Sequence, residues 1–156
     1  MPKEKLRNKT FFQCHFVPKQ LVQDINIFLD KLIQNDTFLF ELNKCKEFFS
    51  IEINFLDEIA IRKLNLEYRD IDNSTDVLSF NLGPVGEIDL CFSIIEKNAI
   101  DLKISSKEEL FRCIIHGILH ILGYDHISKL DTENLSQEEM FLLQENILKN
   151  VTSGSL

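Results

Sequence analysis

The sequence predicts an α+β fold: a single domain in which a mixed β-sheet of about four strands packs with helices, with a metal site on a buried helix. Three observations support this prediction. Short segments rich in β-branched and aromatic residues are interspersed with segments of helical periodicity. Residues 105–122 are apolar nearly all round, which is typical of a buried helix. Three of the four histidines lie within eleven residues around the end of that helix.

Four segments have the composition of strands. The first is rich in aromatic and β-branched residues, and the second alternates well enough to have one buried face. A turn-rich link, Gly83-Pro84-Val85-Gly86, separates the last two. The expected strands are residues 10–17, 48–56, 77–82 and 87–92.

Five segments are expected to be helices. Pro18 suits a first helical turn, while Asp57, Ser93 and either Ser105 or Ser106 are suitable N-caps. The expected helices are residues 18–35, 57–68, 93–99, 105–122 and 131–150. We expect residues 1–150 to form one domain and residues 151–156 to be a frayed tail.

The composition is that of a cytoplasmic protein with no membrane role. The 156 residues carry a formal net charge of −8, which argues against non-specific coating of nucleic acid but does not exclude RNA as a substrate. The first residues lack the apolar core of a signal peptide, and the longest apolar stretch is too short to cross a bilayer. The four cysteines have no C-x-x-C spacing and are expected to be reduced.

The histidines carry the main functional signal. His116 and His120 are one helical turn apart, so both imidazoles can reach one point. Gly123 allows the helix to stop, and His126 follows closely enough to return to that point. Three histidine nitrogens leave a fourth tetrahedral position for water, as in catalytic zinc sites. The pattern predicts one Zn²⁺ per chain, which activates water and polarises a carbonyl or phosphoryl oxygen.

The spacing of these histidines is that of the zinc-peptidase motif H-E-x-x-H-x-x-G-x-x-H, with one departure. Gly117 stands where those enzymes keep their general-base glutamate. The metal geometry can therefore be shared while the reaction differs.

A second polar segment, residues 69–79, lies between an expected helix and an expected strand. Arg69 is the best phosphate ligand in it, because the planar guanidinium matches two anionic oxygens. The alternative is an ion pair with Asp70, Asp72 or Asp76, and local chemistry favours neither.

At these residues the chain resembles the YbeY family of endoribonucleases. Residues 116–126 (HGILHILGYDH) match the family signature H-G-x-L-H-L-x-G-Y-D-H with one conservative change. Residues 64–80 match the upstream pattern L-N-x-x-Y-R-x-x-D-x-P-T-D-V-L-S-F-P, with Ser74 and Asn81 in place of its two prolines. Residues 86–91 (GEIDLC) resemble the next element, G-D-I-x-I-C.

The resemblance implies a metal-dependent endoribonuclease that is specific for single-stranded RNA. Its implied roles are maturation of the 16S rRNA 3′ end and ribosome quality control, with precursor rRNA and the ribosome or its proteins as partners and no DNA or membrane. It also implies zinc held by His116, His120 and His126, and a positively charged channel to which Arg69 contributes. The general base stays open, and the candidates are hydroxide supplied by the metal, Asp125, Asp76 and Asp89.

Two alternatives to this function remain at this level. One is a zinc hydrolase of another class, such as a peptidase, against which Gly117 argues. The other is a non-catalytic, metal-stabilised module that docks on the ribosome, which a fourth protein ligand on the metal would favour.

Overall fold

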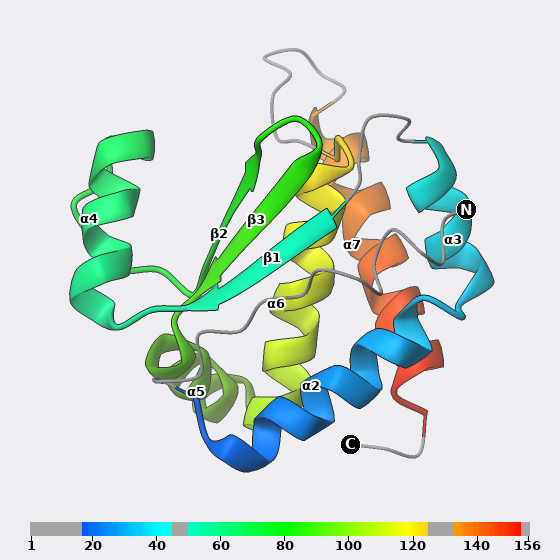
Figure 1. Cartoon of the computed structure of the whole chain (residues 1–156), viewed down its shortest axis with the longest axis horizontal. Coiled ribbons are helices and arrows are strands. Elements are labelled where there is room, and N and C mark those ends of the chain that lie inside the picture. The colour runs from blue at the N-terminus through cyan, green and yellow to red at the C-terminus, as the bar shows by residue number, and fades with distance from the viewer. Residues whose placement is uncertain (1–16, 45–49, 125–132, 154–156) are drawn as a thin grey trace.

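Six helices and three strands make up the described part of the chain, residues 17–44, 50–124 and 133–153 of a computed structural model (Figure 1). The helices are α2 (Lys19–Leu32), α3 (Asp36–Lys44), α4 (Glu58–Arg69), α5 (Phe92–Leu102), α6 (Ser106–Ile121) and α7 (Glu133–Val151). The strands are β1 (Ser50–Phe55), β2 (Val77–Asn81) and β3 (Val85–Leu90). None of the helices in these ranges is both long and apolar enough to span a bilayer.

The strands form one mixed sheet in the order β1-β3-β2, with β1 parallel and β2 antiparallel to β3. A tight turn joins β2 to β3, in which Gly83 adopts a φ of 85° that favours glycine. The α+β class is thus confirmed, with three strands in the described residues where about four were expected. The remaining expected strand, residues 10–17, lies outside the described residues apart from Val17.

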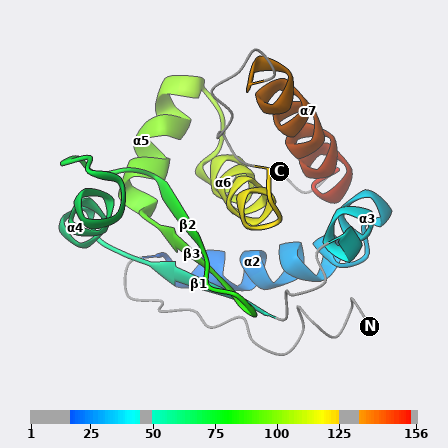
Figure 2. The same ribbon diagram turned by 90° about the horizontal axis from the view of Figure 1, so that it is seen from above.

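Helix α6 lies at the centre of the molecule, enclosed by the sheet, α2, α5 and α7 (Figure 2). Ten of its residues are buried, which confirms the buried helix expected from its apolar sequence. It begins at the expected N-cap, where the Glu108 backbone N–H donates to Ser105 Oγ at 3.0 Å. At Gly117 it lies so close to β3 that a Cβ atom there would be 3.2 Å from Ile88.

Helix α3 was not expected, because the Asn35-Asp36 pair was interpreted only as the end of the preceding helix. In the structure Asn35 also caps α3, since its side-chain oxygen accepts from the Phe38 backbone N–H at 2.9 Å. Phe38 and Leu42 are buried on the inner face of this helix. Burial of these two side chains compensates for the short length of α3.

Two other helix boundaries differ from the prediction. Helix α5 runs beyond the expected 93–99 at both ends. Ser93 does not cap it, because the helix begins at Phe92, and the Ser93 hydroxyl donates to Glu58. Helix α7 continues through Val151, and both Val151 and Thr152 are buried. The expectation of a frayed tail from residue 151 is therefore wrong for these two residues, since Val151 packs into the core.

The face of the sheet turned away from α6 carries an unusual buried carboxylate, Asp89 on β3. Its Oδ1 accepts from Asn54 Nδ2 at 3.1 Å, while Oδ2 has no partner among the described residues. Burial raises the pKa of Asp89 to about 7; the Asn54 hydrogen bond opposes this shift, and the neighbouring Glu87 and Glu52 add to it. Between about pH 4 and pH 7, Asp89 therefore keeps its proton in the folded chain but has lost it in the unfolded chain.

Because the folded-state pKa of Asp89 is raised, the free energy of unfolding falls as pH rises through this window. Asp89→Asn removes the titration and keeps the acceptor for Asn54. We expect the difference in free energy of unfolding, variant minus wild type, to be about 2 kcal/mol larger at pH 8 than at pH 5. Urea unfolding at the two pH values measures this difference. An equal gain at both would contradict the prediction.

Candidate active site

The two helical histidines expected to bind metal do converge. His116 and His120 lie on the same face of α6, with their Nε2 atoms 2.9 Å apart and their ring planes at 79°. Two nitrogens on one tetrahedral zinc ion are roughly 3.3 Å apart, given Zn–N bonds near 2.0–2.1 Å. The two Nε2 atoms would thus need to move apart by only a few tenths of an ångström to bind one zinc ion. Imidazole nitrogens are among the usual ligands of zinc. His126 lies outside the described residues.

The ring of His116 is held from behind by Gln144 on α7. Its Nδ1 is 2.8 Å from the side-chain oxygen of Gln144, which is 5% exposed. Because that oxygen only accepts, Nδ1 carries the proton and the Nε2 lone pair points toward His120. The role of Gln144 was not expected from the sequence. The signal that could have revealed it is a polar residue on the inward face of an amphipathic helix, between Met140 and Ile147.

A cavity of about 520 Å³ opens beside the two histidines. Its walls come from the end of α4, the loop before β2, strand β2 itself and α6. It therefore brings together four of the residues singled out from the sequence, namely Arg69, Asp76, His116 and His120. Its volume is in the range of small-molecule sites, and it is large enough for about one nucleotide.

Arg69 is exposed at the last turn of α4, where Asp70 adopts a left-handed conformation and redirects the chain. Within residues 50–124 no carboxylate forms an ion pair with Arg69. Asp72 pairs with Arg62 at 2.8 Å, and Asp76 accepts from Asn98 Nδ2 at 3.3 Å. This arrangement favours the phosphate-binding interpretation of Arg69 over the ion-pair alternative.

Three other basic residues of this region are neutralised by ion pairs. Arg62, Lys97 and Arg112 are each within ion-pair distance of an aspartate or glutamate. Among the described residues that line the cavity, Arg69 is the only lysine or arginine. The part of the site that is described thus offers one strong anion-binding group instead of a broad basic channel.

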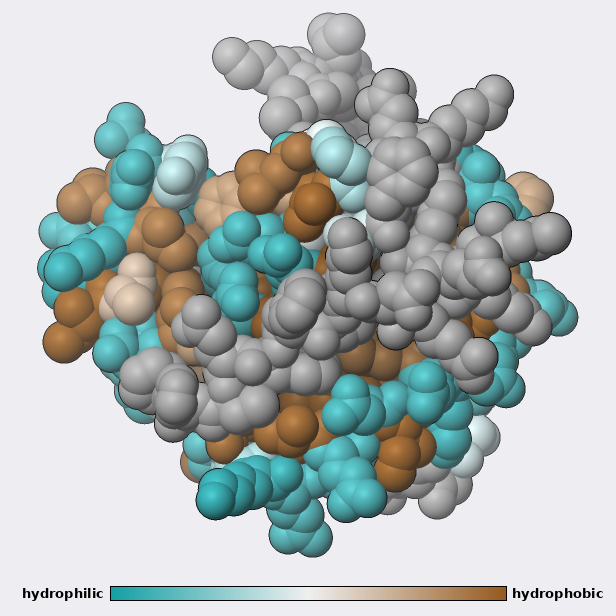
Figure 3. Space-filling model, in the orientation of Figure 1, coloured by the Kyte–Doolittle hydropathy of each residue, from teal (hydrophilic) through white to brown (hydrophobic). Residues whose placement is uncertain are grey.

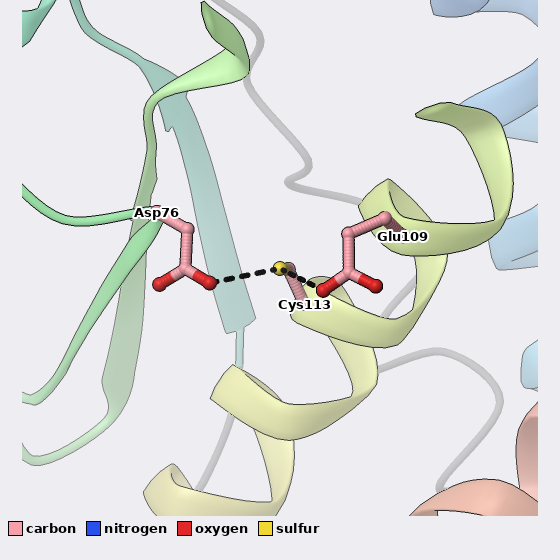
Figure 4. A group of neighbouring side chains, drawn as sticks. All are labelled: Asp76, Glu109 and Cys113. Carbon is pink, nitrogen blue, oxygen red and sulfur yellow. Dashed lines mark hydrogen bonds between the residues drawn. The ribbon is translucent and has the colours of Figure 1, made fainter. Parts of the chain in front are cut away.

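Asp76 also belongs to a second group that sequence analysis missed, together with Glu109 and Cys113 of α6 (Figure 4). The Cys113 thiol is 3.7 Å from Asp76 Oδ2 and 3.8 Å from Glu109 Oε1, and the donor atoms of all three lie within 4.8 Å of one another. Burial, reinforced by both carboxylates, raises the pKa of Cys113. The thiol is therefore protonated and joins the loop before β2 to α6 by hydrogen bonding, whereas metal binding would require the thiolate.

The carboxylates considered as general base are separated by the fold. Asp76 lines the cavity. Asp89 does not line it, and its side chain is only 1% exposed. Asp89 is therefore excluded as a base at this cavity, and Asp125 lies outside the described residues.

Gly117 has a packing reason to be glycine. Even one added carbon would contact three side-chain atoms of Ile88 at 3.2–3.3 Å. A side chain here would require Ile88 to shift by a few tenths of an ångström, and a glutamate would add a carboxylate to this close contact between α6 and β3. The packing of α6 on β3 thus argues against the peptidase alternative.

Comparison with known proteins gives a consistent result. The family model described as endoribonuclease YbeY matches residues 18–152. The endoribonuclease YbeY of Thermotoga maritima is 36% identical over 78% of this chain and 81% of the relative, and that of Mesoplasma florum is 35% identical over 70% of each. The solution structure of TM1509 from Thermotoga maritima is similar with a TM-score of 0.58 and 28% identity, over 88% of this chain and 87% of that one.

Proposed function

Because the chain belongs to the endoribonuclease YbeY family, we propose that it is a zinc-dependent endoribonuclease that cleaves single-stranded RNA. We assign the zinc ligands to His116, His120 and His126. The observation that carries this proposal is the convergence of the first two imidazoles at the wall of the cavity that also contains Arg69.

Arg69, Gln144 and Asp76 have separate tasks in this proposal. When bound, the zinc ion supplies Lewis-acid catalysis and lowers the pKa of water. The Arg69 guanidinium binds two oxygens of the scissile or a neighbouring phosphate and so fixes the RNA backbone. Gln144 holds His116 in the tautomer whose Nε2 faces the site. Asp76 is the described carboxylate placed to accept a proton in the cavity.

The proposed substrate is precursor rRNA, with cleavage at the 3′ end of the small-subunit RNA and a role in ribosome quality control. The proposed partners are the ribosome or its proteins, and the proposed location is the cytoplasm, where these substrates occur. The resemblance of residues 64–91 and 116–126 to the family motifs supports this assignment.

The direct test combines metal analysis with cleavage. Elemental analysis of the purified protein should give about one zinc per chain. The protein should cleave a single-stranded RNA and leave a duplex of the same sequence intact, and a chelator should abolish the cleavage until zinc is added back. Casein serves as the matched peptidase substrate. Casein hydrolysis without RNA cleavage, or RNA cleavage that persists without metal, would refute the proposal.

Removal of the Gln144 acceptor is expected to weaken zinc binding. Gln144→Leu removes the acceptor that Gln144 offers to Nδ1 of His116, and with it the contact that favours the proton on that nitrogen. We expect zinc affinity to fall about 10–100-fold, as for other residues that orient metal-bound histidines. Competition with a chromophoric chelator measures it. Gln144→Glu keeps an acceptor and should retain most of the affinity, whereas equal losses in both variants would argue against this role.

A further inference from the structure

Tyr68 places an exposed aromatic ring at the cavity. It is 60% exposed, precedes Arg69 in the last turn of α4 and lines the same cavity as the two histidines. The other tyrosine of the chain, Tyr124, is half-buried and donates its hydroxyl hydrogen bond to Glu41 at 2.8 Å. Tyr68 is thus the tyrosine that lines the space where a substrate would lie.

The position of this ring is fixed by the sheet. Phe80 of β2 packs edge-to-face against Tyr68, with the ring centroids 5.1 Å apart and the planes at 64°. Phe80 in turn packs on a small core cluster that contains Ile61 and Leu78. The Tyr68 ring is therefore held in place before any ligand arrives, which lowers the entropy cost of stacking on it.

Exposure alone does not distinguish Tyr68, because α4 carries other exposed apolar side chains. Hydrophobic and hydrophilic residues are intermixed over this helix on the face seen in Figure 3. Ile59 and Leu66 are also exposed, but neither lines the cavity. What sets Tyr68 apart is that it shares the cavity with Arg69 and with the histidine pair.

We propose that Tyr68 is a stacking site for one unpaired nucleobase of the RNA, next to the phosphate that Arg69 binds. This inference rests on the proposed function and explains the preference for single-stranded over duplex RNA. A base stacks well on an aromatic side chain only when its face is accessible, and bases within a duplex are covered by their neighbours. The neighbouring guanidinium supplies the phosphate contact that a nucleotide, but not a free apolar group, requires.

The test measures binding of a fluorescein-labelled, unstructured RNA decamer to the full-length, zinc-depleted protein by fluorescence anisotropy, so that cleavage does not interfere. Tyr68→Leu should weaken binding about tenfold, and Tyr68→Phe should bind as the wild type does. Phe141→Leu is the matched control, because Phe141 is 56% exposed on α7 and lies outside the cavity.

Decamers with one abasic position at a time complete the test. In the wild type, one abasic position should cost about the same factor as Tyr68→Leu, and Tyr68→Leu should lose nothing further with that decamer. If the wild type binds the decamer but Tyr68→Leu binds equally well, or if the two losses multiply, the stacking site is wrong while the proposed function stands. If the zinc-loaded wild type neither binds nor cleaves single-stranded RNA, both fail.

Discussion

Replacing His120 with alanine is expected to eliminate stoichiometric zinc and to reduce cleavage of single-stranded RNA at least ~10³-fold, because Lewis-acid stabilisation is worth several kcal/mol. His120 and His116 present their Nε2 atoms to one point, and removal of either leaves only two of the three proposed zinc ligands. Elemental analysis and a single-turnover cleavage assay measure the two losses together.

The control for His120→Ala must separate metal loss from unfolding. Both histidines are only partly buried, so the free energies of unfolding of the zinc-depleted variant and the zinc-depleted wild type should agree within about 1 kcal/mol. His15→Ala removes the histidine that lies outside the proposed ligand set and should retain both zinc and activity. A folded His120→Ala protein that still cleaves RNA at the wild-type rate would refute the metal-dependent mechanism.

Signals that are local in the sequence predicted the fold well. The apolar sequence of α6 indicated that it is buried. The cap at Asp57, and a cap at Ser105 or Ser106, were predictable because a cap needs only a side chain three residues from its partner. Local signals also explain why helix α3 was missed. Asn35 both follows one helix and caps the next, and the tertiary burial of Phe38, which stabilises the second helix, cannot be seen in the local sequence.

The site was predictable to the extent that its parts are close in sequence. His116 and His120 are on one helix face by spacing alone, whereas Gln144 approaches His116 only because α7 packs on α6. Likewise, Asp76 and Cys113 meet because β2 packs against α6. Asp89 stayed among the open candidates for the general base, because its burial away from the cavity depends on how the sheet packs, which the sequence does not show.

Replacing Arg69 with alanine is expected to lower kcat/KM for single-stranded RNA about 10²–10³-fold while zinc content stays at the wild-type level. Among the described residues lining the cavity, Arg69 is the sole lysine or arginine, so no neighbouring cation there replaces its contact with the phosphate. Arg69→Lys should recover part of the loss, because an ammonium keeps the charge but not the two-pronged geometry.

Arg62 offers the matched control for this prediction. It lies on the same helix, seven residues earlier, but its guanidinium already binds Asp72 at 2.8 Å. Arg62→Ala removes the same charge from α4 and should change kcat/KM less than about threefold at 0.15 M salt, where long-range effects of exposed charges are screened. Equal losses in the two variants would mean that the overall charge of α4 attracts the RNA. A loss confined to Arg69 would mean that a positioned guanidinium, in contact with one phosphate, does the binding.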